Sequence, residues 1–234
     1  MIGGIPREVD RQRNLPLINK LYGLLSLNLE EEGLSSLLYN QPATGGSGGQ
    51  WEKETLSSRT SILAGLVNHY RRAVSASDVA LIGSSAGAYM AVSAVKLIET
   101  DGGRVSKLIL LSPAAYPEKI ENIPYGREFT RILHEPWDVS TSPVFAKLEK
   151  FVHSGGKVLV CFFEADDPPI PLYIQEYYRN LMHRLAHNDK DVSVLTIPGV
   201  AHNFRRLNRK RRKNVVDNES IIATARKFFE FLVS

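Results

Sequence analysis

Short apolar runs alternate with longer amphipathic stretches along most of the chain, and this alternation restricts the fold more than any other feature. Runs rich in Val, Ile and Leu, typical of strands, are Leu34–Tyr39, Val79–Gly83, Val105–Leu111, Val158–Phe163 and Val192–Ile197. Apolar residues recur at helical spacing in Leu15–Glu32, Leu56–Ala73, Ala86–Thr100, Ile170–His187 and Glu219–Val233. Strands that alternate with helices predict an α/β fold with a mostly parallel sheet. The near-continuous apolar character of the strands predicts helices on both faces, in three layers.

The length of 234 residues suits a single domain, and we expect residues 1–234 to form one. A short insert at about 113–156 separates two of the predicted strands. Its amphipathic patch at Phe145–Val152 predicts one helix, with an irregular segment beside it. The turn-rich stretch Gln41–Gly49 follows another predicted strand, and it is either a flexible connection or part of the mouth of a binding site.

The composition is that of an ordinary soluble protein, with 43% hydrophobic and 23% charged residues. Cys161 is the one cysteine, so an internal disulfide is excluded, and its apolar surroundings predict a buried, unreactive thiol. No apolar stretch approaches the ~20 residues that a membrane span needs, so no transmembrane segment is expected. No signal-peptide pattern is visible, and a cytoplasmic location is therefore the default expectation.

The positive charge is concentrated in one place. Arg205–Lys213 contains seven of the 29 Lys and Arg residues and none of the 25 acidic residues, although the formal net charge of the chain is only +4. This basic run is either a solvated loop or a contact for an anionic substrate, an acidic partner or membrane headgroups.

A serine stands between a predicted strand and a predicted helix. The run Gly83-Ser84-Ser85-Ala86-Gly87 follows the apolar Val79–Ile82 and opens a helical stretch. Such a strand–turn–helix is strained, and glycines two residues before and after the serine remove side chains that would clash. The helix start also places backbone N–H groups beside the serine. The context therefore predicts that Ser85 is a nucleophile.

A serine nucleophile needs a base, and histidine is the usual one. The six histidines are His69, His134, His153, His183, His187 and His202. His202 lies in a turn-rich loop after the last predicted strand and is the expected base. Three others fall in predicted helices, whereas His134 and His153 fall in the insert and could line a pocket.

An acid that orients the base is expected between nucleophile and base in chain order. Asp166 and Asp167 follow the buried strand that ends at Phe163, in the run Glu164–Pro171. Adjacent aspartates in a loop are often caps or turn formers. Here, however, they follow the carboxyl end of a buried strand, where α/β proteins place their ligands.

These residues make the sequence resemble the small serine esterases and acyl hydrolases of the α/β-hydrolase superfamily, over essentially the whole chain. The resemblance implies that Ser85 is the nucleophile and His202 the base. The family's acid is often followed by a proline four residues later, which favours Asp167, because Pro171 stands there. Counting from the end of the strand favours Asp166 instead.

The resemblance also implies an oxyanion hole made by the N–H groups of Ala86 and Ile5. Gly3-Gly4-Ile5 stands where the family usually has His-Gly and an apolar residue, and Asn40 stands where it often has an aspartate. We expect the strands that usually come before this turn to be absent. We therefore expect a sheet of about six strands with one exposed edge, which a homodimer could cover.

The activity implied is that of a serine hydrolase, which cleaves a carboxylic ester or related acyl substrate through an acyl-enzyme. Acyl transfer on the same triad and a catalytically silent binding protein are the alternatives. No metal or organic cofactor is implied, because the glycine-rich run lacks a phosphate-binding lysine and no zinc-ligand spacing is present. Four aromatic residues of the insert could form an acyl pocket or simply its core: Tyr116, Tyr125, Phe129 and Trp137.

Overall fold

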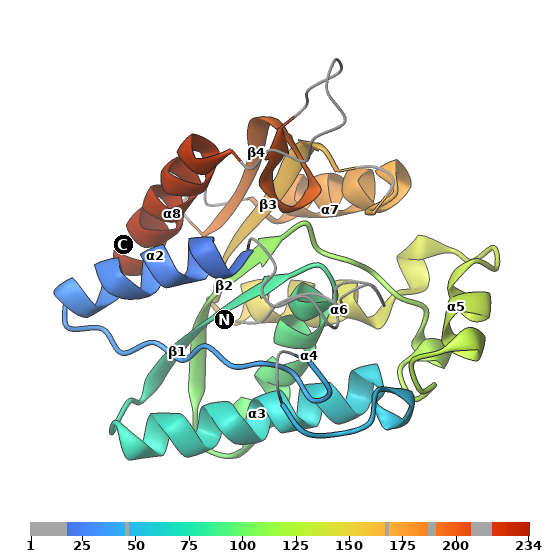
Figure 1. The fold of residues 1–234 in the computed structure, drawn as a ribbon, viewed down its shortest axis with the longest axis horizontal. Helices are drawn as coiled ribbons and strands as arrows, with labels where there is room; N and C mark the ends of the chain where they lie inside the picture. The colour runs from blue at the N-terminus through green and yellow to red at the C-terminus, as the bar shows by residue number, and fades with distance from the viewer. Residues whose placement is uncertain (1–17, 45–46, 167–168, 187–190, 207–216) are drawn as a thin grey trace.

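The computed structural model describes residues 18–44, 47–166, 169–186, 191–206 and 217–234 (Figure 1). Its sheet has the strand order β1-β2-β3-β4-β5. The four long strands run parallel: β1 (Asp78–Ser84), β2 (Arg104–Leu111), β3 (Lys157–Ala165) and β4 (Val192–Ala201). The last strand, β5 (Arg205–Arg206), is a two-residue antiparallel addition to β4.

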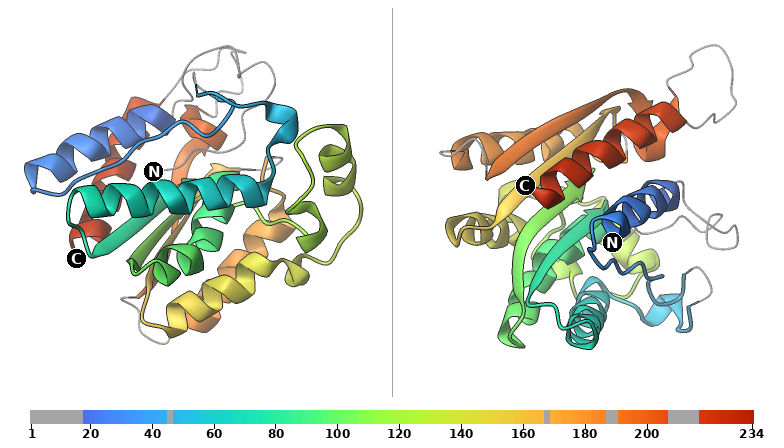
Figure 2. Two further views of the ribbon diagram at one scale, coloured as in Figure 1. Left: turned by 90° about the horizontal axis from the view of Figure 1, so that it is seen from below. Right: turned by 90° about the vertical axis from the view of Figure 1, so that its left-hand side faces the viewer.

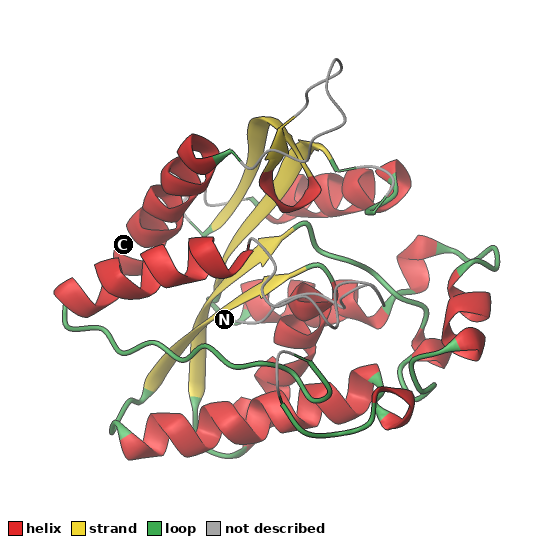
Figure 3. Ribbon diagram, in the orientation of Figure 1, coloured by secondary structure: helices red, strands yellow, loops and turns green. Residues whose placement is uncertain are grey.

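Helices cover both faces of this sheet, as Figures 2 and 3 show. They are α2 (Ile18–Glu31), α3 (Leu56–Ala73), α4 (Ala86–Thr100), α5 (Arg127–Leu133), α6 (Pro143–His153), α7 (Leu172–Leu185) and α8 (Asn218–Val233). Successive strand residues enter opposite cores: Leu110 packs with residues of α3, α4, α6 and α7, whereas Leu111 packs with residues of α2 and α8. The predicted three-layer α/β architecture is confirmed.

One predicted strand is wrong. Leu34–Tyr39 runs as an irregular segment and pairs with no strand of the described sheet. That sheet therefore has five strands in the described residues, not about six. An apolar run becomes a strand only when a neighbour offers backbone partners, and a groove separates this run from the edge strand β1.

The insert holds more regular structure than predicted. Besides α6, it forms α5 and two 3-10 turns, η2 (Glu118–Ile120) and η3 (Val139–Thr141). Apolar residues of the insert and of α4 share one core cluster, and two hydrogen bonds join them: the Tyr89 hydroxyl of α4 donates to the Glu121 carboxylate at 2.6 Å, and the Lys147 ammonium donates to the Ser93 hydroxyl of α4 at 3.1 Å. The insert is therefore held against the helix that follows Ser85.

None of the described helices combines the length and the apolarity needed to cross a bilayer.

The tightest backbone approach lies where β1 turns into α4. A Cβ on Gly83 would lie 2.4 Å from the Gly87 oxygen and 2.6 Å from the Ala88 nitrogen. Both neighbours are backbone atoms at the start of a helix, so they cannot move aside as a flexible side chain could. Only glycine fits at this position.

We therefore predict that Gly83→Ala lowers the free energy of unfolding by about 2–3 kcal/mol, because the methyl group must push the helix away from the strand. The control is Gly65→Ala on α3, where a Cβ would meet no atom within 4 Å. That change should raise the unfolding free energy by about 0.5–1 kcal/mol. Urea unfolding measures both, and equal effects would contradict the steric account.

Cys161 is fully buried on β3, and burial raises the pKa of its thiol well above the usual value. Thiolate is the reactive form, so we predict negligible reaction with a disulfide reagent in the native protein and rapid reaction in urea. Rapid native labelling would show that the strand opens readily.

Candidate functional site

Ser85 occupies a strained turn. Its φ of 54° and ψ of −122° lie where residues other than glycine are rarely found. The backbone is held on both sides, since the Ser85 N–H donates to the Leu111 carbonyl at 2.9 Å and its own carbonyl accepts from Ala114 at 3.2 Å. Strain of this kind costs about 1–3 kcal/mol and persists only where the surroundings impose it.

The helix α4 begins directly after this serine, at Ala86. The first N–H groups of a helix have no partner within the helix, and they carry the positive end of its dipole. The turn therefore places backbone donors next to the Ser85 side chain.

Asp166 is the first residue after β3, and it is buried. Its Oδ2 accepts from the Ser112 hydroxyl at 2.6 Å and from the Phe163 N–H at 3.2 Å. Its Oδ1 lies 2.5 Å from Nδ1 of His202. Two donors thus fix the carboxylate in place, independently of its contact with the imidazole.

His202 follows β4 and opens the short turn η4 (His202–Phe204). Its side chain is 17% exposed, and its ring packs edge-on against Phe163 at 5.9 Å between centroids. With Nδ1 against Asp166, the other ring nitrogen remains for a second partner. The structure shows no hydrogen bond between His202 and Ser85, and such contacts are often long before a substrate binds.

A second carboxylate links the two strands that lead to the acid and to the histidine. Glu164 on β3 accepts from the Gly199 N–H at 2.6 Å. Gly199 lies where the pairing of β3 with β4 is irregular, just before the pair Ala165 and Ala201. Side-chain contacts therefore join β3 and β4 near their ends through Glu164 and Gly199, and join the residues after them through Asp166 and His202.

Ser112 is a site residue that the sequence reasoning missed. It follows β2, has a positive φ of 46°, and donates its hydroxyl to Asp166. Its N–H donates to the Cys161 carbonyl at 2.7 Å. The sequence did hold one indication of this role. Ser112 directly follows a predicted strand, and that strand lies in chain order between the strands that lead to Ser85 and to Asp166.

A cavity of about 570 Å³ opens beside Ser85. Its lining is mainly apolar and comes from the insert and the start of α7: Ala114, Ala115, Tyr116, Leu133, His134, Glu135, Pro136, Trp137, Pro169, Ile170, Pro171, Tyr173 and Ile174. Two of the four aromatic residues considered for an acyl pocket thus line it. The other two, Tyr125 and Phe129, are buried and pack against each other with ring centroids 4.9 Å apart.

The remaining predicted residues divide into two groups. Ser85, Ala86, Asp166 and His202 are described, whereas Asp167, Ile5 and Leu207–Lys213 of the basic run lie outside the described residues. Of the histidines expected in the insert, His134 lines the cavity, whereas His153 ends α6 and is absent from the lining. Within the described ranges, no three His, Cys, Asp or Glu side chains gather as a metal-ligand set.

No protein-family model matches the sequence, and no curated protein sequence matches it. Solved structures do match the fold. Est1E from Butyrivibrio proteoclasticus, solved with ferulic acid bound, aligns over 99% of this chain and 86% of its own, with a TM-score of 0.64 and 19% identity.

Two other structures give the same result. An esterase from Pyrococcus furiosus covers 99% of this chain and 80% of its own, with a TM-score of 0.62 and 14% identity. An α/β serine hydrolase homologue from Coxiella burnetii covers 99% and 83%, with a TM-score of 0.58 and 16% identity. With its parallel sheet, its two helical layers and its strained strand-to-helix turn, the chain has the α/β-hydrolase fold.

Proposed function

We propose that this protein is a serine hydrolase that cleaves a carboxylic ester or related acyl substrate. The observation that carries the proposal is the strained turn at Ser85, at the same sheet edge as the hydrogen-bonded pair of Asp166 and His202. A backbone in this conformation costs stability, and strain of this kind is found most often at functional sites. An imidazole held by a buried carboxylate is the arrangement that a serine nucleophile requires.

In this mechanism Ser85 Oγ attacks the carbonyl carbon of the substrate. His202 takes the serine proton on Nε2 and then delivers it to the leaving group. Asp166 keeps the proton of the neutral ring on Nδ1 and stabilises the imidazolium that forms. A water activated by the same histidine releases the acyl group and regenerates Ser85.

The tetrahedral intermediate carries a negative oxygen that needs fixed donors. The Ala86 N–H at the start of α4 is one proposed donor, and the Ile5 N–H is the second expected from the resemblance. Removing one such donor costs about 3–4 kcal/mol of barrier in enzymes of this kind.

The size of the cavity beside Ser85 favours a substrate with an acyl group of modest size. Tyr116 and Trp137 offer aromatic surface, and His134 and Glu135 add polar groups. The fold neighbours include esterases, one of them solved with ferulic acid bound, which agrees with an ester as substrate. We propose an ester whose acyl group packs against these aromatic side chains.

The Asp166 carboxylate is our proposed acid, in place of Asp167, which the sequence motif favoured. Asp166 is buried, is held by two donors and lies against His202. Each of these contacts is what the acid of a triad needs in order to fix the ring.

We predict that Ser85→Ala lowers turnover of a short p-nitrophenyl ester by at least roughly a thousandfold, because no other group replaces the nucleophile. The matched control is Ser84→Ala at the neighbouring buried serine, which should keep most of the activity. Turnover that survives in Ser85→Ala would contradict the enzyme and would favour a silent binding protein. Adding an alcohol or amine acceptor then separates acyl transfer from hydrolysis by the product formed.

The two adjacent aspartates should differ sharply. Asp166→Asn should lower kcat by about a hundredfold or more, because a neutral amide cannot stabilise the imidazolium and can stabilise the wrong tautomer. Asp167→Asn should stay within about threefold of the parent. Steady-state kinetics on the same ester measures both, and the opposite ranking would transfer the acid role to Asp167.

A further inference from the structure

The residues that follow β2 form a buried irregular segment, 112–117, between the Ser85 turn and the insert. Each of its residues is buried, although the segment belongs to no helix or strand. A segment of this kind usually runs over the surface, because its backbone N–H and C=O groups need partners when they are buried. The partners of this segment therefore show what holds it in place.

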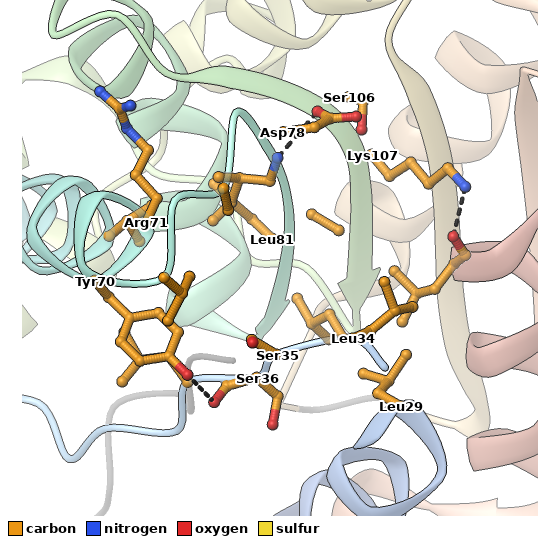
Figure 4. A pocket seen from close by; sticks show the side chains of 18 of the residues that line it. Leu29, Leu34, Ser35, Ser36, Tyr70, Arg71, Asp78, Leu81, Ser106 and Lys107 are labelled. Carbon is orange, nitrogen blue, oxygen red and sulfur yellow. Dashed lines mark hydrogen bonds between the residues drawn. The ribbon is translucent and has the colours of Figure 1, made fainter. Parts of the chain in front are cut away.

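The Ser85 turn is held from the side of this segment. β1 is the first strand in the order of the described sheet, with β2 on one side and a groove of about 450 Å³ on the other (Figure 4). On the β2 side, the Ala114 N–H donates to the Ser85 carbonyl at 3.2 Å. That carbonyl also accepts from Ala88 of α4 at 3.0 Å, so Ala114 adds a contact from outside the helix. A strained turn persists only where such neighbours impose it.

The same segment is attached to the proposed acid. Ser112 is fully buried, and its hydroxyl lies 2.6 Å from Oδ2 of Asp166, a separation typical of a hydroxyl that donates to a carboxylate. Only Pro113 separates Ser112 from Ala114, and the proline ring restricts φ to about −65°. These three residues form a short link of restricted geometry between Asp166 and Ser85.

A tyrosine of α7 holds one end of this link. The Tyr178 hydroxyl donates to the carbonyl of Ala114 at 3.0 Å, and the N–H of the same residue holds Ser85. Tyr178 is fully buried, and its ring packs edge-on against Phe145 and Phe162, with centroids 4.9 and 6.3 Å away. Burial raises the pKa of the Tyr178 hydroxyl well above its usual value, so the group stays protonated and remains a donor.

Loss of this hydroxyl would remove a donor from a buried carbonyl. An unsatisfied buried carbonyl is costly, so the segment would shift toward another partner. Such a shift moves the Ala114 N–H, and with it the backbone of Ser85. A displacement of about 1 Å at a reacting group can cost roughly a hundredfold in rate. A hydroxyl that does not contact the reacting atoms can therefore affect the chemical step.

We propose that Tyr178 is a positioning residue: through the Ala114 carbonyl it fixes the link between Asp166 and Ser85, and so sets the position of the nucleophile. This role rests on the proposed hydrolase function, because Tyr178 is given a part only in the reaction of Ser85. Tyr178 acts through Ala114 and is absent from the described lining of the cavity. Its loss should therefore affect the chemical step more than substrate binding.

The test compares Tyr178→Phe with Tyr177→Phe in the full-length protein, with a short p-nitrophenyl ester as substrate. Each change removes one hydroxyl from α7 and keeps the ring, but Tyr177 is only partly buried and packs on Phe145. Tyr178→Phe should lower kcat by about tenfold and leave KM within about threefold, because the reacting geometry is disturbed while the cavity lining is kept. Tyr177→Phe should keep kcat within about twofold of the parent.

Ser112→Gly releases the other end of the link. Glycine readily takes the φ of 46° found here, so this variant is expected to fold even if Tyr178→Phe does not. It should also lower kcat by about tenfold and keep KM within about threefold. Because both side chains hold the same link, the double variant should lose less than the product of the two single losses. A parent-like kcat in folded Ser112→Gly would contradict the role of the link.

Thermal melts separate a positioning role from a purely structural one. If Tyr178→Phe melts at a lower temperature but keeps the parent kcat, the hydroxyl only stabilises the fold and the proposal is overturned. Equal losses in Tyr178→Phe and Tyr177→Phe, or losses that multiply in full in the double variant, would overturn it as well. Turnover that survives Ser85→Ala removes both this role and the hydrolase function. Turnover that requires Ser85 but is unaffected by Tyr178→Phe removes the role of Tyr178 alone.

Discussion

The turn from β1 to α4 has room for a hydrogen atom at Gly83 but not for a methyl group, and the geometry of the site depends on this approach. Because helix and strand come so close, Ser85 must take a positive φ, and its side chain stands at the start of α4. The strain is borne by the hydrogen bonds of Ser85 to the residues that follow β2 and to the end of β2 itself. Ser85, our proposed nucleophile, is thus positioned by the sheet rather than by a flexible loop.

The parallel pairing of the strands brings the other residues of the site together. Four parallel strands end at one edge, and the residues after three of them, Ser112, Asp166 and His202, form a continuous set of hydrogen bonds. Glu164 of β3 adds a second link by accepting from the Gly199 N–H of β4, three residues before His202. Ser112 and Asp166 are therefore fixed by strands with apolar runs that are buried on both faces, and in the mechanism we propose such a site needs little reorganisation when charge develops.

The sequence alone was sufficient to predict features that depend on a single helix or turn. The bounds of α3 and α4 follow from helical periodicity, and the Ser85 turn follows from its glycines. It was insufficient to predict features that depend on how two elements pack or pair with each other. Leu34–Tyr39 has a strand composition but pairs with no strand of the described sheet, and β3 extends to Ala165, two residues beyond its apolar run. That extension makes Asp166 the first residue after the strand, which a proline motif could not reveal. The role of Ser112 needed the order of the strands.

The central claim is that Ser85 is a nucleophile activated by the pair of Asp166 and His202. The most direct measurement is to locate, by tandem mass spectrometry, the covalent adduct that a fluorophosphonate probe leaves on the native protein. We predict a single adduct on Ser85, which is lost in His202→Ala although that variant keeps the fold. An adduct on another serine, or labelling of Ser85 that does not require His202, would contradict it.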